Sequence, residues 1–153
     1  MLRISKLTDY AIVLMTLFAN SPAQGTRTAR DLASASRLPL PTVSKILKSL
    51  CRAGLLASQR GASGGYGLAR PASGISLAHV VEAIEGPLAL TECCAVNLKA
   101  CDVEEGCPMR SQWQVINRAV YKALDELTLD QLTRPLESAV PLGRALSLVR
   151  SPA

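Results

Sequence analysis

The spacing of apolar residues in the first third of the chain predicts short helices. Between residues 7 and 18 the apolar side chains recur every three or four positions, which is the spacing of one helical face. We expect the hydroxyl of Thr8 to cap this helix. A second helix is predicted from Thr28 to about Ser36, because Thr28 and Asp31 have the spacing of a capping box.

A third helix is predicted to begin near Pro41, since proline is well tolerated in the first helical turn, and to end at Gly54. Its expected buried face is apolar and consists of Val43, Ile46, Leu47, Leu50 and Cys51. Its opposite face is polar and basic and consists of Thr42, Ser44, Lys45, Lys48, Ser49 and Arg52. Two short helices of this kind, joined by a tight bend, are typical of a helix-turn-helix that places its second helix in the major groove.

The residues after this helix predict a β-hairpin. Residues 55–60 and 66–68 have strand character, and the five residues between them are rich in glycine. A hairpin after a helix-turn-helix is the wing of a winged helix, and Arg60 at its edge is placed to contact a phosphate or the minor groove. A nucleotide-binding loop is the weaker interpretation, because no Walker lysine follows.

The second half of the chain predicts helices of another kind. Ser76 caps a helix that Gly86 ends, and His79 on it is expected to pack or to form a hydrogen bond. The longest helix is predicted over residues 108–127, followed by a short helix capped at Thr128. Apolar residues at alternating spacings of four and three form a seam, which we expect to pair two subunits although packing within one chain would need a similar stripe. The seam consists of Met109, Trp113, Ile116, Val120, Ala123 and Leu127.

These elements give a mainly α fold with a small β-hairpin. The expected organisation is a winged helix-turn-helix domain over residues 1–86 and a cysteine-rich loop over 87–107. A dimerisation helix with a short C-terminal helix follows over 108–133, and a tail without a clear pattern over 134–153.

The distribution of charge along the chain indicates what kind of partner the protein binds. Residues 1–80 contain ten Lys and Arg against two Asp and Glu, whereas residues 81–133 contain four against nine. A basic first half is expected of a protein that binds double-stranded DNA. The apolar run over residues 10–19 is too short to cross a membrane and no signal peptide is evident, so we expect a cytoplasmic protein with no membrane partner.

Four of the five cysteines lie together, at Cys93, Cys94, Cys101 and Cys107. In a reducing compartment clustered cysteines are metal ligands or redox groups rather than structural disulfides. An iron–sulfur centre is the favoured interpretation. Tetrahedral zinc and a disulfide switch remain alternatives, although the chain has no CxxC pair. An enzyme is not expected, since the chain has one histidine and no acid–base or nucleophile constellation.

Several motifs together resemble the IscR/NsrR family of bacterial iron–sulfur transcription regulators, over about residues 1–132. They are Leu2-Arg3-Ile4 before Lys6 to Ala11, Leu40 to Leu47, Arg60 to Tyr66, and the cysteine loop before a long helix. Within that family, Leu88 to Cys93 and Trp113 to Arg118 are most similar to the branch that regulates the SUF cluster-assembly operon.

The resemblance implies a homodimer with one 2Fe-2S cluster per protomer. It implies three cysteine ligands, namely Cys93 (or Cys94), Cys101 and Cys107. Some members use a histidine three residues after the last cysteine, but that position is Arg110 here. Other members use an acidic residue near the start of the first helix, supplied by the partner subunit, and Asp9 matches that position. The resemblance thus implies Asp9 of the partner subunit as the fourth ligand, with Cys94 and then Glu92 as alternatives.

The function implied is that of a repressor of iron–sulfur cluster assembly genes, whose binding to its operator is controlled by the cluster. The alternative is a zinc-binding or thiol-disulfide regulator that binds DNA without a cluster. The residues expected to contact DNA are Thr42, Ser44, Lys45, Lys48 and Arg60. Those expected to pair the subunits are Trp113, Ile116, Val120 and Leu127.

Overall fold

A computed structural model describes residues 4–21, 25–61, 64–95, 101 and 106–134. The tail after residue 134, the first three residues, the tip of the wing and most of the cysteine loop lie outside the described residues. The helices are α1 (Lys6–Ala19), α2 (Ala29–Ser36), α3 (Leu40–Arg52), α4 (Leu77–Glu85), α5 (Arg110–Asp125) and α6 (Leu129–Leu132). The strands are β1 (Leu56–Gln59) and β2 (Gly65–Leu68), and two 3₁₀ turns are η1 (Ala72–Gly74) and η2 (Glu92–Cys94).

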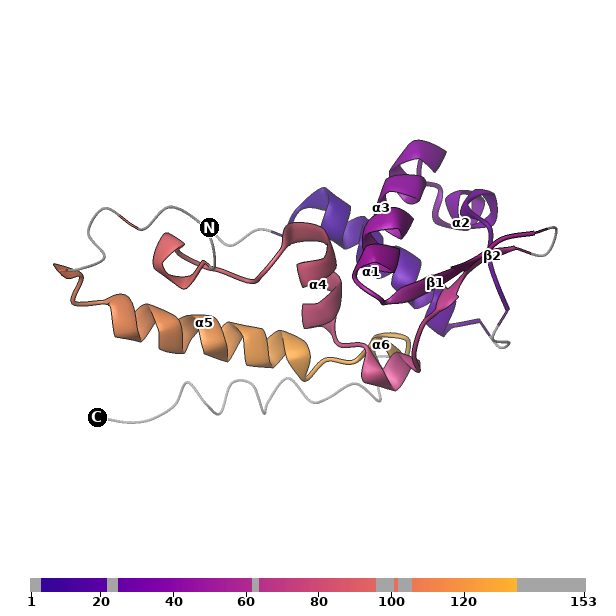
Figure 1. The fold of residues 1–153 in the computed structure, drawn as a ribbon. Coiled ribbons are helices and arrows are strands. Elements are labelled where there is room, and N and C mark those ends of the chain that lie inside the picture. Colours follow the sequence, from indigo (N-terminus) through magenta and orange to yellow (C-terminus); the bar gives the residue numbers. More distant parts are fainter. Residues whose placement is uncertain (1–3, 22–24, 62–63, 96–100, 102–105, 135–153) are drawn as a thin grey trace.

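The fold is mainly helical with one antiparallel hairpin, as the sequence predicts. The hairpin lies at one end of the elongated molecule and the first turn of α5 at the other (Figure 1). No helix in the described part of the chain is long and apolar enough to cross a membrane.

The cap of α1 differs from the prediction. Ser5, not Thr8, is the N-cap, and its hydroxyl accepts a hydrogen bond from the Thr8 N–H at 3.2 Å. Thr8 lies three residues further on, where its side chain is buried, and its hydroxyl donates to the carboxylate of Glu85 at the end of α4. The helix begins at Lys6, one residue before the predicted span, and its cap lies three residues before Thr8, because a cap can precede the first residue of the apolar face.

The helix-turn-helix follows the predicted signals. Thr28 and Asp31 form the expected capping box, with the Asp31 N–H donating to the Thr28 hydroxyl at 3.2 Å and the Thr28 N–H donating to the Asp31 carboxylate at 3.1 Å. Pro41 is the second residue of α3. Gly54 has φ +70°, the left-handed conformation that ends helices.

The wing has a third, single-residue strand that the sequence analysis missed. The N–H of Arg27 donates to the carbonyl of Tyr66 at 2.9 Å, and the N–H of Tyr66 donates to the carbonyl of Arg27 at 2.8 Å. This close approach requires a glycine at Gly65, where an added Cβ would lie 2.8 Å from the Arg27 carbonyl oxygen. The predicted hairpin is confirmed, and its strands pair Leu56 with Leu68 through Gln59 with Gly65.

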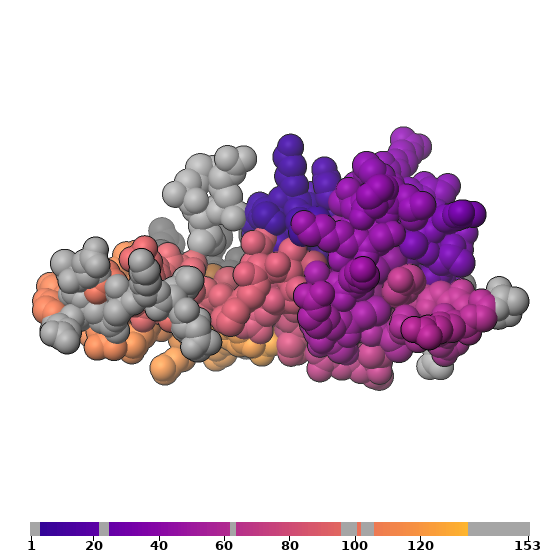
Figure 2. Space-filling view, turned by 45° about the horizontal axis from the view of Figure 1, so that its top comes forward, coloured from indigo at the N-terminus to yellow at the C-terminus, as the bar shows by residue number. Residues whose placement is uncertain are grey.

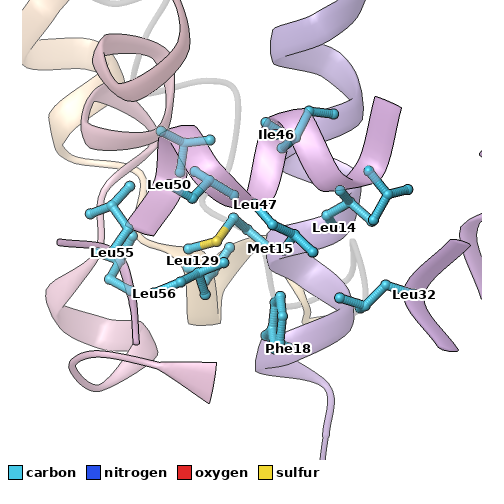
Figure 3. Close-up of a cluster of buried hydrophobic side chains, with 14 residues drawn as sticks. Leu14, Met15, Phe18, Leu32, Ile46, Leu47, Leu50, Leu55, Leu56 and Leu129 are labelled. Carbon is cyan, nitrogen blue, oxygen red and sulfur yellow. The ribbon is translucent and has the colours of Figure 1, made fainter. Parts of the chain in front are cut away.

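One apolar core joins the helices to the hairpin, and its side chains point toward one another in Figure 3. Helices α1 and α3 supply most of it, and Leu55 and Leu56 close it beneath the wing. The short helix α6 adds Leu129, which is 1% exposed. The Leu129 N–H donates to the Ile75 carbonyl at 2.8 Å and the Leu77 N–H donates to the Leu127 carbonyl at 2.7 Å. The end of α5 is therefore tied to the start of α4.

Helix α5 packs against the rest of the chain along only part of its surface. None of its residues is fully buried. Within the predicted seam, Trp113 and Val120 are half-buried, whereas Met109 and Ile116 are 45% and 39% exposed. The helix is one turn shorter than the predicted span of 108–127. Since the described residues leave part of the seam exposed, its role in pairing subunits stays a prediction that this exposure supports.

The contact between α4 and α1 depends on a carboxylate. Hydrogen bonds from the Ser5 and Thr8 hydroxyls hold the pKa of Glu85 below its ordinary value of 4.5. A depressed folded-state pKa stabilises the fold above the unfolded-state pKa, and this contribution is lost as the pH falls through the folded-state pKa.

We expect Glu85→Gln to lower the free energy of unfolding at pH 7 by on the order of 1 kcal/mol, because the carboxylate is largely solvent-screened. The difference from wild type should shrink below about pH 4.5, as measured by urea unfolding at several pH values. A difference that stays constant down to pH 3 would show that Glu85 acts through packing alone.

Candidate nucleic-acid interface and cysteine site

Helix α3 presents the face predicted to meet DNA. Lys45 and Lys48 are exposed, and Thr42 and Ser44 are half-buried along its edges. The opposite side is fully buried, with Val43, Ile46, Leu47 and Leu50 all at 0% exposure. Because the buried side anchors α3 firmly in the core, the polar side is held rigidly at the surface.

The exposed end of α3 also carries a residue that the sequence analysis did not single out. Leu40, the first residue of the helix, is 39% exposed next to the exposed Pro41. A leucine at this position lies on the edge of the apolar stripe, so the pattern alone did not mark it as a surface residue. Apolar side chains at the tip of a recognition helix are able to contact thymine methyl groups.

The wing places Arg60 directly after β1, where its side chain is exposed. The turn behind it is tight, since an added Cβ at Gly64 would lie 2.6 Å from the Gln59 carbonyl oxygen. Gly61, with φ +117°, begins that turn. Glycine tolerates both the positive φ and the close backbone approach, so these two positions permit the turn that leaves Arg60 at the edge of the wing.

The first two cysteines lie together on η2. The Thr91 hydroxyl lies 3.2 Å from the sulfur of Cys93 and 3.4 Å from the sulfur of Cys94. Both side chains are half-buried, as are Cys101 and Cys107, and all four thiols are free. Among the described residues no group of three His, Cys, Asp or Glu side chains gathers around a common point. The structure therefore places Cys93 and Cys94 beside one hydroxyl and assembles no three-ligand group among the residues that it describes.

The side chain of Asn117 fixes the segment that leads to these cysteines. Its amide oxygen accepts a hydrogen bond from the Leu90 N–H at 3.0 Å, and its amide nitrogen donates to the Leu88 carbonyl at 3.0 Å. Asn117 thus pairs with two backbone groups of an extended segment as a neighbouring strand would. Sequence reasoning missed this role, because an asparagine in a long helix carries no local signal for a distant backbone partner.

A pocket of about 320 Å³ lies between η2 and α5. The sulfur-bearing side chains of Cys93 and Cys94 line one side, and Gln114, Asn117, Arg118 and Tyr121 of α5 line the other. Glu82 and Asp125 raise the pKa of Tyr121, with Glu82 the larger cause, because a phenolate beside these carboxylates would be repelled. The phenol is therefore a hydrogen-bond donor near neutral pH.

The remaining predicted residues are spread over the molecule. Asp9 is exposed in the first turn of α1, and Glu92 is exposed on η2. His79 forms the predicted hydrogen bond, with its Nδ1 accepting from the Ser76 N–H at 3.0 Å. Cys51 packs against the core, and burial raises the pKa of its thiol, which fits a small apolar residue.

The helix-turn-helix, its basic exposed helix and the hairpin beside it define a winged-helix DNA-binding protein. The family model Rrf2, described as an iron-dependent transcriptional regulator, matches residues 4–135. The chain belongs to this family of DNA-binding transcription regulators.

Individual relatives agree with this assignment. The transcriptional regulator NsrR of Oceanobacillus iheyensis is 27% identical over 144 residues, covering 92% of this chain and 96% of the relative. Protein aau3 of Rhizobium meliloti is 32% identical, covering 87% and 86%. Among solved structures, CymR, the global cysteine regulator of B. subtilis, has a TM-score of 0.67 at 28% identity, covering 87% and 97%. IscR of T. potens has a TM-score of 0.66 at 25% identity, covering 95% and 96%.

We expect Asn117→Ala to release the segment before the cysteines without unfolding the protein. Two hydrogen bonds worth about 1 kcal/mol each are lost, so the Leu90 amide should exchange its hydrogen about ten times faster or more. Hydrogen exchange followed by NMR measures this. Gln114→Ala, on the same helix, is the control and should leave Leu90 unchanged; equal protection in Asn117→Ala would disprove the clamp.

Proposed function

We propose that the chain is a homodimeric repressor of iron–sulfur cluster assembly genes, whose binding to operator DNA is controlled by a 2Fe-2S cluster in each protomer. One observation carries this proposal. Four free, half-buried thiols follow a segment that a hydrogen bond from Thr8 of α1 holds at Glu85 and that Asn117 of α5 holds at Leu88 and Leu90. The description of the matching family as iron-dependent and the likeness to NsrR and IscR support it.

The donor set suits such a cluster chemically. Cys93, Cys101 and Cys107 would supply three thiolates, and Asp9 of the partner subunit would supply a carboxylate, with Cys94 and Glu92 as the alternatives. A cluster with three thiolates and one oxygen ligand provides a redox-active and exchangeable centre when bound. Because no three of these groups gather at one point among the described residues, the loop has to close for a cluster to be held.

The chain's own contacts connect the cysteine segment to the DNA-binding surface. After Glu85, which bonds to Thr8 of α1, the segment continues through Leu88 and Leu90, which bond to Asn117 of α5. Helix α4 packs against α1 and α3 as well as α5. Figure 2 shows α4 and the residues after it, pink to salmon, between the body and the orange α5. A displacement of η2 would therefore be transmitted to α1, and in a dimer it would change the distance between the two α3 helices.

The dimer itself is proposed to form along α5. Trp113, Ile116, Val120 and Leu127 lie on the incompletely covered seam, and a second copy of the same helix would bury it. A helix-turn-helix protein gains affinity and half-site spacing from such pairing.

A second candidate is a thiol-responsive regulator without a cluster. It is favoured by the free thiols of the cysteine segment and by the likeness to CymR, a cysteine regulator. Iron, sulfide and zinc analysis of anaerobically purified protein, with an absorption spectrum, separates the two. Iron and sulfide in equal amounts support the cluster, whereas a colourless, iron-free protein that still binds its promoter favours the thiol regulator.

We expect Cys101→Ala to remove the visible absorbance of anaerobically purified protein and to weaken operator binding at matched salt. Cys51→Ala, whose thiol packs against the core, should retain both. If Cys101→Ala keeps the wild-type spectrum and affinity, the cluster proposal is wrong.

The exposed lysines of α3 should differ in their effects on DNA binding. Lys48→Ala should weaken specific and random DNA equally and reduce the salt slope by about 1, as loss of a phosphate contact does. Lys45→Ala should also reduce specificity by about 1–3 kcal/mol if it reaches a guanine. Lys122→Ala on α5 is the control. Fluorescence anisotropy at several salt concentrations is the measurement; equal losses on both DNAs for Lys45→Ala exclude it from base recognition.

A further inference from the structure

Cys93 and Cys94 form a pair of neighbouring thiols that could bind a ligand without Cys101 and Cys107. Both sulfur atoms lie within 3.4 Å of the same Thr91 hydroxyl oxygen, so they face one side of η2. Their side chains also line the same pocket against α5. The arrangement needs no movement of Cys101 or Cys107.

A disulfide is a poor product for this pair. The Cα atoms of adjacent residues joined by a trans peptide are about 3.8 Å apart, whereas disulfides usually require about 4.4–6.8 Å. Closing the S–S bond would therefore strain the backbone. A soft metal ion placed between the two sulfurs, at bonds of about 2.3 Å each, leaves them further apart and avoids that strain.

The number of available ligands selects the ion. Among the described residues no third His, Cys, Asp or Glu side chain joins the two thiols. Structural zinc takes four such ligands. Soft thiolate ligands favour copper(I), and copper(I) can be two-coordinate. The pocket between η2 and α5 gives the ion a route to the sulfurs.

We propose that Cys93 and Cys94 form a binding site for one copper(I) ion when the chain carries no iron–sulfur cluster. Each thiol releases its proton to water as its sulfur binds, and neither copper nor sulfur changes oxidation state. Asn117 acts as a positioning residue, because it holds the segment that presents both sulfurs to the pocket. If the proposed function is also correct, Cys93 serves both centres, so copper(I) and the cluster exclude each other.

The test is an anaerobic titration of cluster-free, full-length protein with copper(I) in competition with bicinchoninate, a coloured copper(I) chelator. Wild type should withdraw one equivalent of copper(I) per chain. Cys94→Ser should bind at least about tenfold more weakly, since even the loss of an outer-shell partner of a metal site costs that much. Cys101→Ser and Cys107→Ser should match wild type.

Two further variants keep the result interpretable. Cys94→Met retains a soft sulfur ligand and should restore part of the affinity that Cys94→Ser loses. Cys51→Ser controls for loss of a thiol elsewhere. Loss of copper(I) binding in Cys101→Ser, or unchanged binding in Cys94→Ser, overturns the site.

The same variants distinguish this site from the proposed cluster. Cys101→Ser should lose the visible absorbance of the cluster while it keeps copper(I) binding. If wild type and every variant lack the absorbance but follow the expected copper(I) pattern, the cluster proposal fails and the copper(I) site stands. If the absorbance behaves as expected but copper(I) binding depends on Cys101, the copper(I) site fails and the cluster proposal stands.

Discussion

The burial of Leu129 in the core is the constraint on which the rest of the structure depends. Helix α6 returns to the winged-helix body directly after α5. The C-terminal end of α5 therefore cannot leave that body without exposing the side chain of Leu129 to water. The backbone bonds that join Leu127 to Leu77 and Leu129 to Ile75 reinforce this return. Helix α5 is thus fixed at its C-terminal end, its first turn lies at the end of the molecule opposite the hairpin (Figure 1), and η2 packs against it.

The segment between α4 and η2 forms no helix or strand, but its backbone has hydrogen-bond partners. Glu85 is held by hydroxyls of α1, and the backbone at Leu88 and Leu90 is held by Asn117. Polar backbone groups outside helices and strands need such partners when they are shielded from water. The same bonds that satisfy them also connect the thiols to the helices that hold α3, so a change at the thiols has a physical path toward the DNA-binding surface.

Two of the four clustered cysteines share surroundings in the structure. Cys93 and Cys94 have a common hydroxyl neighbour and a common pocket, and no third ligand-type side chain completes a group of three among the described residues. A centre that needs three thiolates requires the loop to close, and an ion that needs two does not. The number of thiolates that a metal centre needs therefore decides which conformation of the loop that centre favours. A centre that binds one conformation more tightly than the other shifts the population toward it.

The sequence by itself determined the elements and their order, because helix periods, the Thr28 capping box, Pro41 and the glycines of the wing are local signals. It also marked the exposed lysines of α3 and the four clustered cysteines. Only the tertiary structure decided that the Thr8 hydroxyl donates to Glu85, that Arg27 adds a strand to the wing, that Asn117 clamps the segment before η2, and that Cys93 and Cys94 share a hydroxyl neighbour. These features depend on contacts between residues far apart in the chain, or on how a turn aims its side chains, and neither leaves a periodic trace in the sequence.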